Sequence, residues 1–303
     1  MDKAKIIDGK HVSSVLKSWI GVEVTTLLNT KDITPGLAVI MVGNDAASKV
    51  YVRNKTKTAK KLGMNIFDFS LPVNISQEDI RALIIKLNND SKVHGILLQL
   101  PLPGHLNSIP LLSLIHPDKD VDALNPINAG KLIAGNAEMV PCTPLGSYLL
   151  IKTQLDSLSG KNVVIIGRSL LFGKPMGQIL LLENSTVTMT HSRTLDIEKH
   201  CQRADILIAA VGNPEMVKAS WVKKNAIVID VGINRVKQDE EKYKILGDVD
   251  YENTIKVAKA ITPVPGGVGP MTIACLMFNT LSATQIKNDI PTYPWKELYK
   301  KLI

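Results

Sequence analysis

Residues 162–182 read NVVIIGRSLLFGKPMGQILLL and carry the clearest signal of fold class in the chain. Its first five residues form a short apolar run of the kind found in parallel strands buried on both faces. A glycine turn follows, and the residues from Pro175 onward predict a helix. A nucleotide phosphate binds where such a turn meets a helix N-terminus. The turn departs from GxGxxG at Ser169 and reaches its last glycine one residue late, at Gly173. Alone it is a weak signal, because any tight strand-to-helix turn favours glycine.

The next strand bears on which dinucleotide would bind. It covers Thr186–Thr190 and ends roughly 20 residues after the turn, where NAD-binding units carry an Asp or Glu for the ribose 2′-hydroxyl. Here the strand is followed by His191, Ser192 and Arg193, and Arg168 adds a cation in the turn. Cations and hydroxyls without a carboxylate favour a 2′-phosphate, which indicates NADP over NAD. A polar surface turn without a ligand is the alternative that the pattern leaves open.

The same alternation of apolar runs and amphipathic stretches continues along the chain and indicates an α/β fold with right-handed crossovers. We expect strands at Leu37–Val42, Asn65–Leu71, Gly95–Leu100, Val163–Gly167, Thr186–Thr190, Ile206–Ala210 and Ile227–Val231. We expect helices at about 11–29 and 46–62, one opened by a capping box at Ser76, and one from about Pro270.

The chain length suggests two cores, and the run Pro141-Cys142-Thr143-Pro144-Leu145-Gly146 punctuates the pattern between them. We therefore expect two α/β domains flanking a cleft. The first spans residues 1–142 and is completed by a C-terminal helix at 280–303. The second spans residues 143–279 and is a Rossmann-type dinucleotide-binding domain.

Composition excludes several classes of protein. The 303 residues carry a formal net charge of +8, but the basic residues are scattered and the 13 aromatic residues do not alternate with them. A stacking platform for nucleic acid is therefore not expected, and the charge fits a solvated surface or the attraction of small polyanions. No apolar run approaches the roughly 18 residues of a membrane span. Three cysteines without a CxxC, and a start without an apolar signal region, predict a cytoplasmic protein.

The helix expected at 46–62 carries one lysine on an unexpected face. At roughly 100° per residue, Lys55 shares its stripe with Tyr51 and Ala59, whereas five other basic residues fall on the opposite side. A lysine that only lays its stem across apolar surface would explain this position. The functional alternative is a partly desolvated amine with a lowered pKa, suited to proton transfer beside a flat ring.

Two further segments carry polar groups that fit a ligand site. Gln99 lies at the carboxyl end of an apolar strand, which is the ligand-binding end in α/β sheets. Asp120 and Asp122 are one residue apart and would share a face in extended structure. Metal binding by this pair is a weak hypothesis, because no further ligand follows at a suitable spacing. We therefore expect no metal site.

Taken together, these segments resemble the bifunctional methylenetetrahydrofolate dehydrogenase/cyclohydrolase family, the FolD type. The matching runs are YVRNKTK, GILLQLPLP, HPDKDVDALNPINAGKL, PCTPLG, VVIIGRSLLFGKPMG, ADILIAAVGNP, VIDVGIN and TPVPGGVGPMT, in the family's order over residues of about 43 to 275. The resemblance implies NADP-linked oxidation of 5,10-methylenetetrahydrofolate, followed by hydrolysis of the methenyl product to 10-formyltetrahydrofolate. It also implies one-carbon metabolism, tetrahydrofolate derivatives as ligands, and a homodimer formed through the second domain.

The resemblance also assigns roles to single residues. Lys55 would be the general acid/base of the hydrolytic step, Tyr51 would stack on the folate, and Gln99 would contact Lys55. Asp122 would anchor the pterin ring. The NADP contacts would be Gly167, Arg168, Ser169, Ser192 and Ile233. A loop that approaches both ligands closely would be formed by Pro265, Gly266 and Gly267.

The chain departs from the family pattern in one place that bears on binding. Ala123 stands where DVDG has its glycine, and an alanine with positive φ would strain this loop by about 1 kcal/mol and shift Asp122. The competing interpretations are a dehydrogenase with a structural Lys55, an enzyme that uses NAD, and a basic RNA-binding protein.

Overall fold

The computed structural model describes residues 3–237 and 243–302, and these form two compact units. We call them the six-stranded unit and the three-stranded unit after their main sheets. The six-stranded unit comprises Met1–Ser14, Thr143–Thr272 and Tyr299–Ile303. The three-stranded unit comprises Val15–Cys142 and Ile273–Leu298. Both are of the α/β class, as the sequence predicts.

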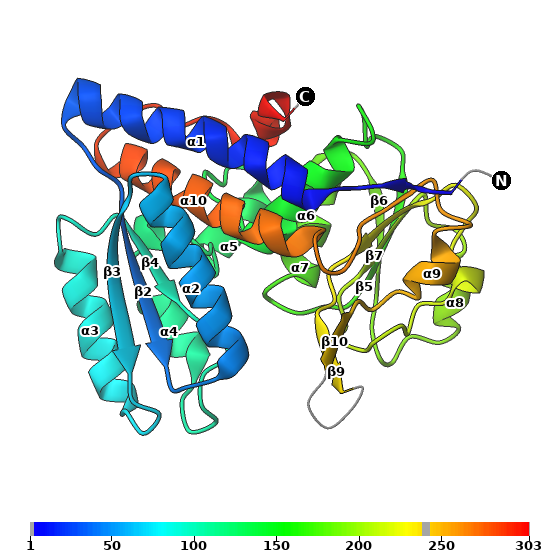
Figure 1. Cartoon of the computed structure of the whole chain (residues 1–303), viewed down its shortest axis with the longest axis horizontal. Helices are drawn as coiled ribbons and strands as arrows, with labels where there is room; N and C mark the ends of the chain where they lie inside the picture. The colour runs from blue at the N-terminus through cyan, green and yellow to red at the C-terminus, as the bar shows by residue number, and fades with distance from the viewer. Residues whose placement is uncertain (1–2, 238–242, 303) are drawn as a thin grey trace. The chain divides into compact units, whose positions relative to one another are not determined.

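The six-stranded unit is built on a parallel sheet in which the strand at residues 162–166 has a neighbour on each side (Figure 1). Across the sheet the strands follow the order β1 (Lys5–Ile6), β11 (Ala260–Ile261), β8 (Ile227–Asp230), β7 (Ile206–Ala209), β5 (Asn162–Ile166) and β6 (Thr186–Thr190). The chain passes from β5 to β6 on one side and then to β7 on the other. Its switch point therefore lies between β5 and β7, where α/β sheets bind ligands.

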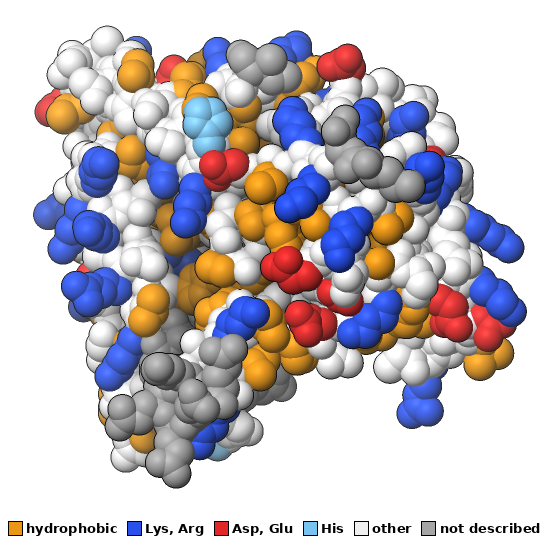
Figure 2. Space-filling view, turned by 45° about the vertical axis from the view of Figure 1, so that its right-hand side comes forward, with side chains coloured by type: hydrophobic (Ala, Val, Ile, Leu, Met, Phe, Trp, Pro, Cys, Tyr) orange, Lys and Arg blue, Asp and Glu red, His pale blue; other side chains and the backbone are white. Residues whose placement is uncertain are grey.

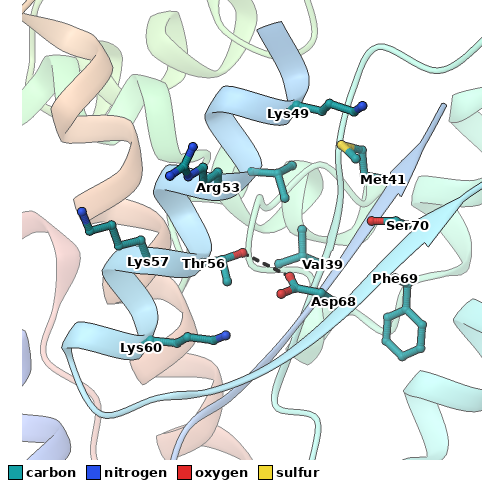
Figure 3. Close-up of a pocket in the computed structure, with 11 residues that line it drawn as sticks. Val39, Met41, Lys49, Arg53, Thr56, Lys57, Lys60, Asp68, Phe69 and Ser70 are labelled. Carbon is teal, nitrogen blue, oxygen red and sulfur yellow. Dashed lines mark hydrogen bonds between the residues drawn. The ribbon is translucent and has the colours of Figure 1, made fainter. Parts of the chain in front are cut away.

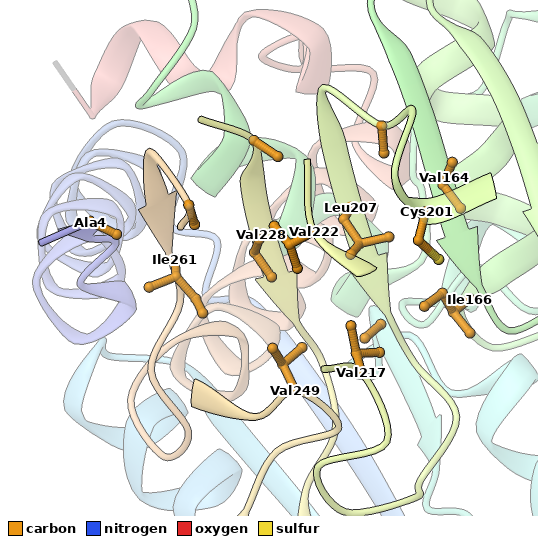
Figure 4. Close-up of a cluster of buried hydrophobic side chains, with 14 residues drawn as sticks. Ala4, Val164, Ile166, Cys201, Leu207, Val217, Val222, Val228, Val249 and Ile261 are labelled. Atoms are coloured by element: carbon orange, nitrogen blue, oxygen red, sulfur yellow. The ribbon is translucent and has the colours of Figure 1, made fainter. Parts of the chain in front are cut away.

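Helices cover both faces of this sheet because its strands are apolar on both sides. On one face, Val164, Leu207 and Val228 pack into a buried cluster with Cys201 and Val249 (Figure 4). A Cβ on Gly177 of the helix after β5 would meet Ile165 and Met189, so that helix covers the other face. The helices of this unit are α6 (Cys142–Lys152), α7 (Gly173–Leu182), α8 (Ile197–Cys201) and α9 (Tyr251–Thr254). An antiparallel hairpin, β9 (Asn234–Lys237) and β10 (Tyr243–Leu246), follows β8.

The three-stranded unit has a smaller parallel sheet in the order β3 (Asn65–Leu71), β2 (Gly36–Val42) and β4 (Gly95–Leu98). Alternate residues of β2, such as Ala38 and Ile40, pack with Ile80 and Ile84 on one side of the sheet. The helices of this unit are α2 (Ala46–Lys61), α3 (Gln77–Asn89), α4 (Ser108–Leu114) and α5 (Pro126–Ala134). Two longer helices, α1 (Gly9–Lys31) and α10 (Val268–Lys287), each contribute residues to both units.

The structure differs from the expected elements mainly at their ends. β4 ends at Leu98 rather than at residue 100, although the Gln99 N–H still donates to the Ile40 carbonyl. α7 starts at Gly173, two residues before Pro175, because proline fits within the first turn of a helix. The sequence analysis did not find β1, β11 or the hairpin. Strands of two to four residues depend on their pairing partners, and their own composition predicts little.

The compact units also differ from the expected domain boundaries. β1 pairs with β11, so the first residues belong to the six-stranded unit rather than to the domain expected at 1–142. Residues 273–279 belong to the three-stranded unit, and the last residues, 299–303, to the six-stranded one. The functional division, with folate bound by the first domain and NADP by 143–279, stays a prediction.

Candidate functional site

Helix α2 presents Lys55 to the interior of the three-stranded unit. Asp45 caps the helix by accepting a hydrogen bond from the Ser48 N–H, which fixes where it begins. Lys55 is only 7% exposed, and Ala59 one turn later is fully buried. The five other basic side chains of this helix are all exposed, namely Lys49, Arg53, Lys57, Lys60 and Lys61. The structure thus confirms the burial of one lysine that the helical period indicated.

Gln99 holds the buried amine. The Lys55 ammonium donates to Gln99 Oε1 at 2.9 Å. The other end of the amide, Nε2, donates to the Leu100 carbonyl, and this bond sets which end of the side chain faces Lys55. Tyr51 lies one turn before Lys55 and is half-buried, and its burial raises the pKa of the phenol. At this site, therefore, an amine, an amide and a phenol come from neighbouring elements.

The acidic loop after α4 is held by a buried carboxylate. Asp120 accepts hydrogen bonds from the Asn125 N–H at 2.7 Å and from Asn128 Nδ2 at 3.0 Å. Burial raises its pKa to about 6, and these two donors oppose the shift. The backbone of Asp120 also forms a parallel bridge with Ile96 of β4. Asp120 thereby fixes the loop in which the half-exposed Asp122 lies.

Cys142 is a buried thiol whose pKa responds both to Asp122 of this loop and to Lys55. The sequence did not indicate it as a site residue. Burial raises the pKa of its thiol well above the usual range, the Asp122 carboxylate raises it further, and the Lys55 ammonium acts in the opposite direction. Asp122 and Lys55 thus both lie within electrostatic range of one buried thiol. The motif PCTPLG drew attention to this position only as a boundary. Nothing in the spacing of this motif predicted that Cys142 lies within electrostatic range of Lys55.

The turn after β5 has the geometry of a phosphate-binding turn. Gly167 has a φ of 123°, and a Cβ there would lie 2.3 Å from the Ala210 carbonyl oxygen at the end of β7. Ser169 Oγ accepts from the Phe172 N–H at 3.1 Å. Phe172 precedes α7 without a side-chain cap, and the turn closes onto the helix through the Lys174 N–H, which donates to the Ser169 carbonyl at 3.1 Å. Arg168 is exposed in this turn.

The turn after β6 supplies further polar groups. The Arg193 N–H donates to His191 Nδ1, and the His191 N–H donates to Thr194 Oγ1, so the turn around the exposed Ser192 is closed by its own side chains. An acid does occur slightly later, at Asp196. Its carboxylate is paired with Lys199 at 2.7 Å. This carboxylate is therefore already engaged by a lysine, while the turn itself offers a hydroxyl and a cation.

Two more predicted contact regions belong to the six-stranded unit. Ile233 lies between β8 and β9 and is 49% exposed, so its apolar side chain is open to a ligand. In the loop before α10, Gly266 has a φ of 114° and its carbonyl accepts from the Lys10 N–H at 3.1 Å. A Cβ on Gly9 would lie 1.8 Å from the Gly267 carbonyl oxygen, so the start of α1 supports this loop by backbone contact.

A cavity of about 500 Å³ in the three-stranded unit lies apart from these residues (Figure 3). It is lined by Val39 and Met41 of β2, by the exposed basic face of α2, and by Asp68 of β3. Thr56 Oγ1 donates to Asp68 Oδ1 at 3.1 Å across it. None of the predicted site residues contributes to its lining.

The basic side chains of one face (Figure 2) and the possible metal ligands among the described residues do not gather in clusters. On the face shown in Figure 2, Lys and Arg side chains are dispersed among acidic and apolar ones rather than gathered in one patch. Among residues 3–237 and 243–302, no group of three His, Cys, Asp or Glu could hold a metal ion. No helix in the same ranges is long and apolar enough to cross a membrane.

Known families match both parts of the chain. Residues 7–122 match the catalytic domain of tetrahydrofolate dehydrogenase/cyclohydrolase, and residues 141–288 match its NAD(P)-binding domain. A protein of Dinoroseobacter shibae named Bifunctional protein FolD is 54% identical over 290 residues, which cover 95% of this chain and 97% of that protein. The chain belongs to the tetrahydrofolate dehydrogenase/cyclohydrolase family. The resemblance drawn from the sequence motifs is therefore confirmed.

Solved structures of the family agree with this assignment. The FolD methylenetetrahydrofolate dehydrogenase/cyclohydrolase of Campylobacter jejuni is 43% identical, with a TM-score of 0.89 over 94% of this chain and 99% of that one. The FolD enzyme of Trypanosoma brucei, solved with NADP cofactor and inhibitor, is 38% identical, with a TM-score of 0.91 over 95% of this chain and 99% of that one. The family's fold thus extends over nearly the whole chain.

Proposed function

We propose that this FolD-family chain is a bifunctional enzyme of one-carbon metabolism. It oxidises 5,10-methylenetetrahydrofolate to 5,10-methenyltetrahydrofolate with NADP, and it hydrolyses the methenyl product to 10-formyltetrahydrofolate. Membership of the family, matched over both of its domains, supports the pair of reactions. The observation that carries the hydrolytic half is the buried Lys55 ammonium on Gln99.

In the dehydrogenase reaction the protein mainly has to orient the substrate relative to the cofactor. NADP accepts a hydride from the methylene carbon, which two nitrogens already activate, so no protein base has to remove a proton. In our proposal, Tyr51 stacks on the folate and Asp122 anchors the pterin ring. Pro265, Gly266 and Gly267 form a loop of close approach. All of these residues bind and orient the substrate.

Residues of the six-stranded unit fit NADP. The uncapped start of α7 and the positive φ of Gly167 form a turn of the kind that a pyrophosphate can approach. We assign the cofactor contacts to Gly167, Ser169 and Ile233, and the contacts with the 2′-phosphate to Arg168 and Ser192. The lack of a free carboxylate in the turn after β6 supports NADP over NAD.

The hydrolytic reaction requires proton transfer. Water adds to the methenyl carbon and loses one proton, which leaves a hydroxyl group on that carbon. The hydroxyl then loses its proton as the formyl C=O forms and the bond from the carbon to N5 breaks, and N5 takes up a proton. The products are 10-formyltetrahydrofolate and one released proton. We assign these transfers to the Lys55 amine, because it is buried and already aligned by a neutral amide.

Assembly and location extend the proposal. We propose a homodimer through the six-stranded unit and a cytoplasmic location without nucleic-acid or membrane partners. The three cysteines are free and buried, which supports a reducing compartment. Light scattering of the purified protein would test the dimer.

Absorbance in the band of methenyltetrahydrofolate tests the function itself. Purified protein is mixed with methylenetetrahydrofolate and either NADP or NAD. We expect this absorbance to rise with NADP, and preformed methenyltetrahydrofolate to be consumed faster than without enzyme. Formation of the methenyl product without accelerated hydrolysis would identify a single-activity dehydrogenase. Equal turnover with NAD would contradict the cofactor assignment.

A further inference from the structure

Two buried carboxylates lie beneath the loops that follow β7 and β8, and they belong to no site assigned above. Asp230 is the last residue of β8 and Asp248 follows the hairpin, and they are 2% and 0% exposed. Neither forms a salt bridge with a Lys or Arg among the described residues. Burying a carboxylate without a cation is costly unless its oxygens are satisfied by hydrogen bonds.

Asp248 satisfies its oxygens with donors from two different loops. Its Oδ2 accepts from the N–H groups of Val211 at 2.6 Å and Gly212 at 3.0 Å. Its Oδ1 accepts from the Asn213 N–H at 3.0 Å and from Asn234 Nδ2 at 2.9 Å. Three bonds therefore hold the loop after β7, and the fourth holds the residue that follows Ile233. This fills the roughly four acceptor sites of a carboxylate.

Asp230 fixes the position of Asp248 itself. Asp230 Oδ1 accepts from the N–H groups of Asp248 at 2.9 Å and Gly232 at 3.0 Å, and its Oδ2 accepts from the Val249 N–H at 2.9 Å. Gly232 and the Asp248 side chain are tightly packed, because a Cβ on Gly232 would lie 2.3 Å from Asp248 Oδ1. The two carboxylates form one rigid support at the ligand-binding end of the sheet.

We propose that Asp248 is a positioning residue for NADP, because it holds the loops 211–213 and 232–234 in the arrangement that the cofactor meets. The inference rests on the proposed function, which places Ile233 against the cofactor. Asp248 does not touch the cofactor in this account. It acts through the backbone of the two loops, and its absence would leave three N–H groups of adjacent residues without acceptors. Binding would then have to order both loops first.

The test is Asp248→Asn, with Asp250→Asn as its matched control. Asp250 undergoes the same chemical change two residues later, and there its carboxylate accepts from the N–H and the Nδ2 of Asn253 in the short helix α9. For Asp248→Asn we expect the KM for NADP and the dissociation constant of NADPH to rise about tenfold or more. Hydrolysis of preformed methenyltetrahydrofolate, assayed without cofactor, should stay within about twofold of the parent. Asp250→Asn should match the parent in all three measurements.

A second variant keeps the proposal testable if Asp248→Asn does not fold. Asn234→Ala removes one donor and frees only the loop after β8, so we expect a smaller increase of about threefold in the KM for NADP. An unchanged KM in a folded Asp248→Asn protein, or in Asn234→Ala when the first variant fails to fold, would overturn the proposal. A parent protein without NADP-linked activity would instead overturn the proposed function.

Discussion

Lys55 shows how far single residues can be predicted from sequence. The helical period placed it with Tyr51 and Ala59, and the structure buries it there. Its bond to Gln99 was expected only from the family resemblance, because the residues are 44 positions apart and no local pattern connects them. Cys142 could not have been found at all, since a buried thiol beside a lysine leaves no periodic signal.

Ala123 adopts the positive φ that the glycine of the family pattern would adopt more easily. Its φ is 53°, and its side chain is 2% exposed. We predict that Ala123→Val lowers the free energy of unfolding by about 2 kcal/mol or more, because a β-branched side chain fits positive φ poorly. Ala123→Gly should change it by less than about 1 kcal/mol, since relief of strain is offset by unfolded-state entropy. Urea denaturation measures both.

The control for Ala123 is Ala129→Val in α5, which is exposed and helical. It should cost only about 0.5 kcal/mol. If both valine variants lost the same stability, the left-handed conformation of Ala123 would be contradicted.

His94 predicts a dependence of stability on pH. Its Nδ1 accepts a hydrogen bond from the Gly36 N–H at 3.0 Å, so this nitrogen carries no proton. Burial, assisted by Lys287 and Lys119, lowers its pKa from 6.5 to about 4. The unfolded chain binds a proton between these values and the folded chain does not. The contribution of neutral His94 to the free energy of unfolding is therefore complete above pH 6.5. This contribution is lost as the pH falls toward 4, by up to about 3 kcal/mol.

The variant His94→Asn tests this contribution, because an amide oxygen can replace Nδ1 as the acceptor. Its free energy of unfolding should fall less steeply than that of the parent protein between pH 6.5 and 4. A matched change at the exposed His11 should leave the parent's slope unaltered. Parallel curves for His94→Asn and the parent would contradict the prediction.

At the scale of elements, the glycine turn after β5 was predictable in type but not in detail. Strand, turn and helix follow from composition, whereas the need for Gly173 comes from close backbone packing within the turn itself. A Cβ there would lie 2.2 Å from the Gly167 carbonyl oxygen. The short strands β1 and β11 could not be predicted, because each is stabilised by a partner distant in sequence. The hairpin strands pair with each other, but each has only four residues, whose composition predicts little.

Gly173→Ala should therefore slow NADP-dependent oxidation more than hydrolysis. The added methyl group pushes the turn apart, so we predict a loss of NADP-dependent oxidation of about tenfold or more, with hydrolysis of preformed methenyltetrahydrofolate retained. Gly130→Ala in α5 is the control, because a Cβ there meets nothing within 4 Å. Steady-state assays of both reactions measure the difference. Equal losses in the two reactions would contradict the assignment of this turn to the cofactor.

At the scale of the whole molecule, the sequence sufficed for the α/β class and the family but not for the division into units. The described residues 3–14 and 299–302 both belong to the six-stranded unit, and the first of these segments joins its sheet because β1 pairs with β11. A two-residue strand carries no signal that would reveal this. The net charge of +8 identified no partner, and the exclusion of nucleic acid stays a prediction.

The central claim is that one buried amine performs the proton transfers of hydrolysis while the rest of the site serves oxidation. The most direct measurement compares both activities of Lys55→Met with those of Lys57→Met, the same change on the exposed face of α2. We predict that Lys55→Met loses hydrolysis by about 100-fold or more and retains part of its NADP-dependent oxidation. Lys57→Met should keep both. An equal loss of the two activities in Lys55→Met, or the survival of hydrolysis, would contradict the account.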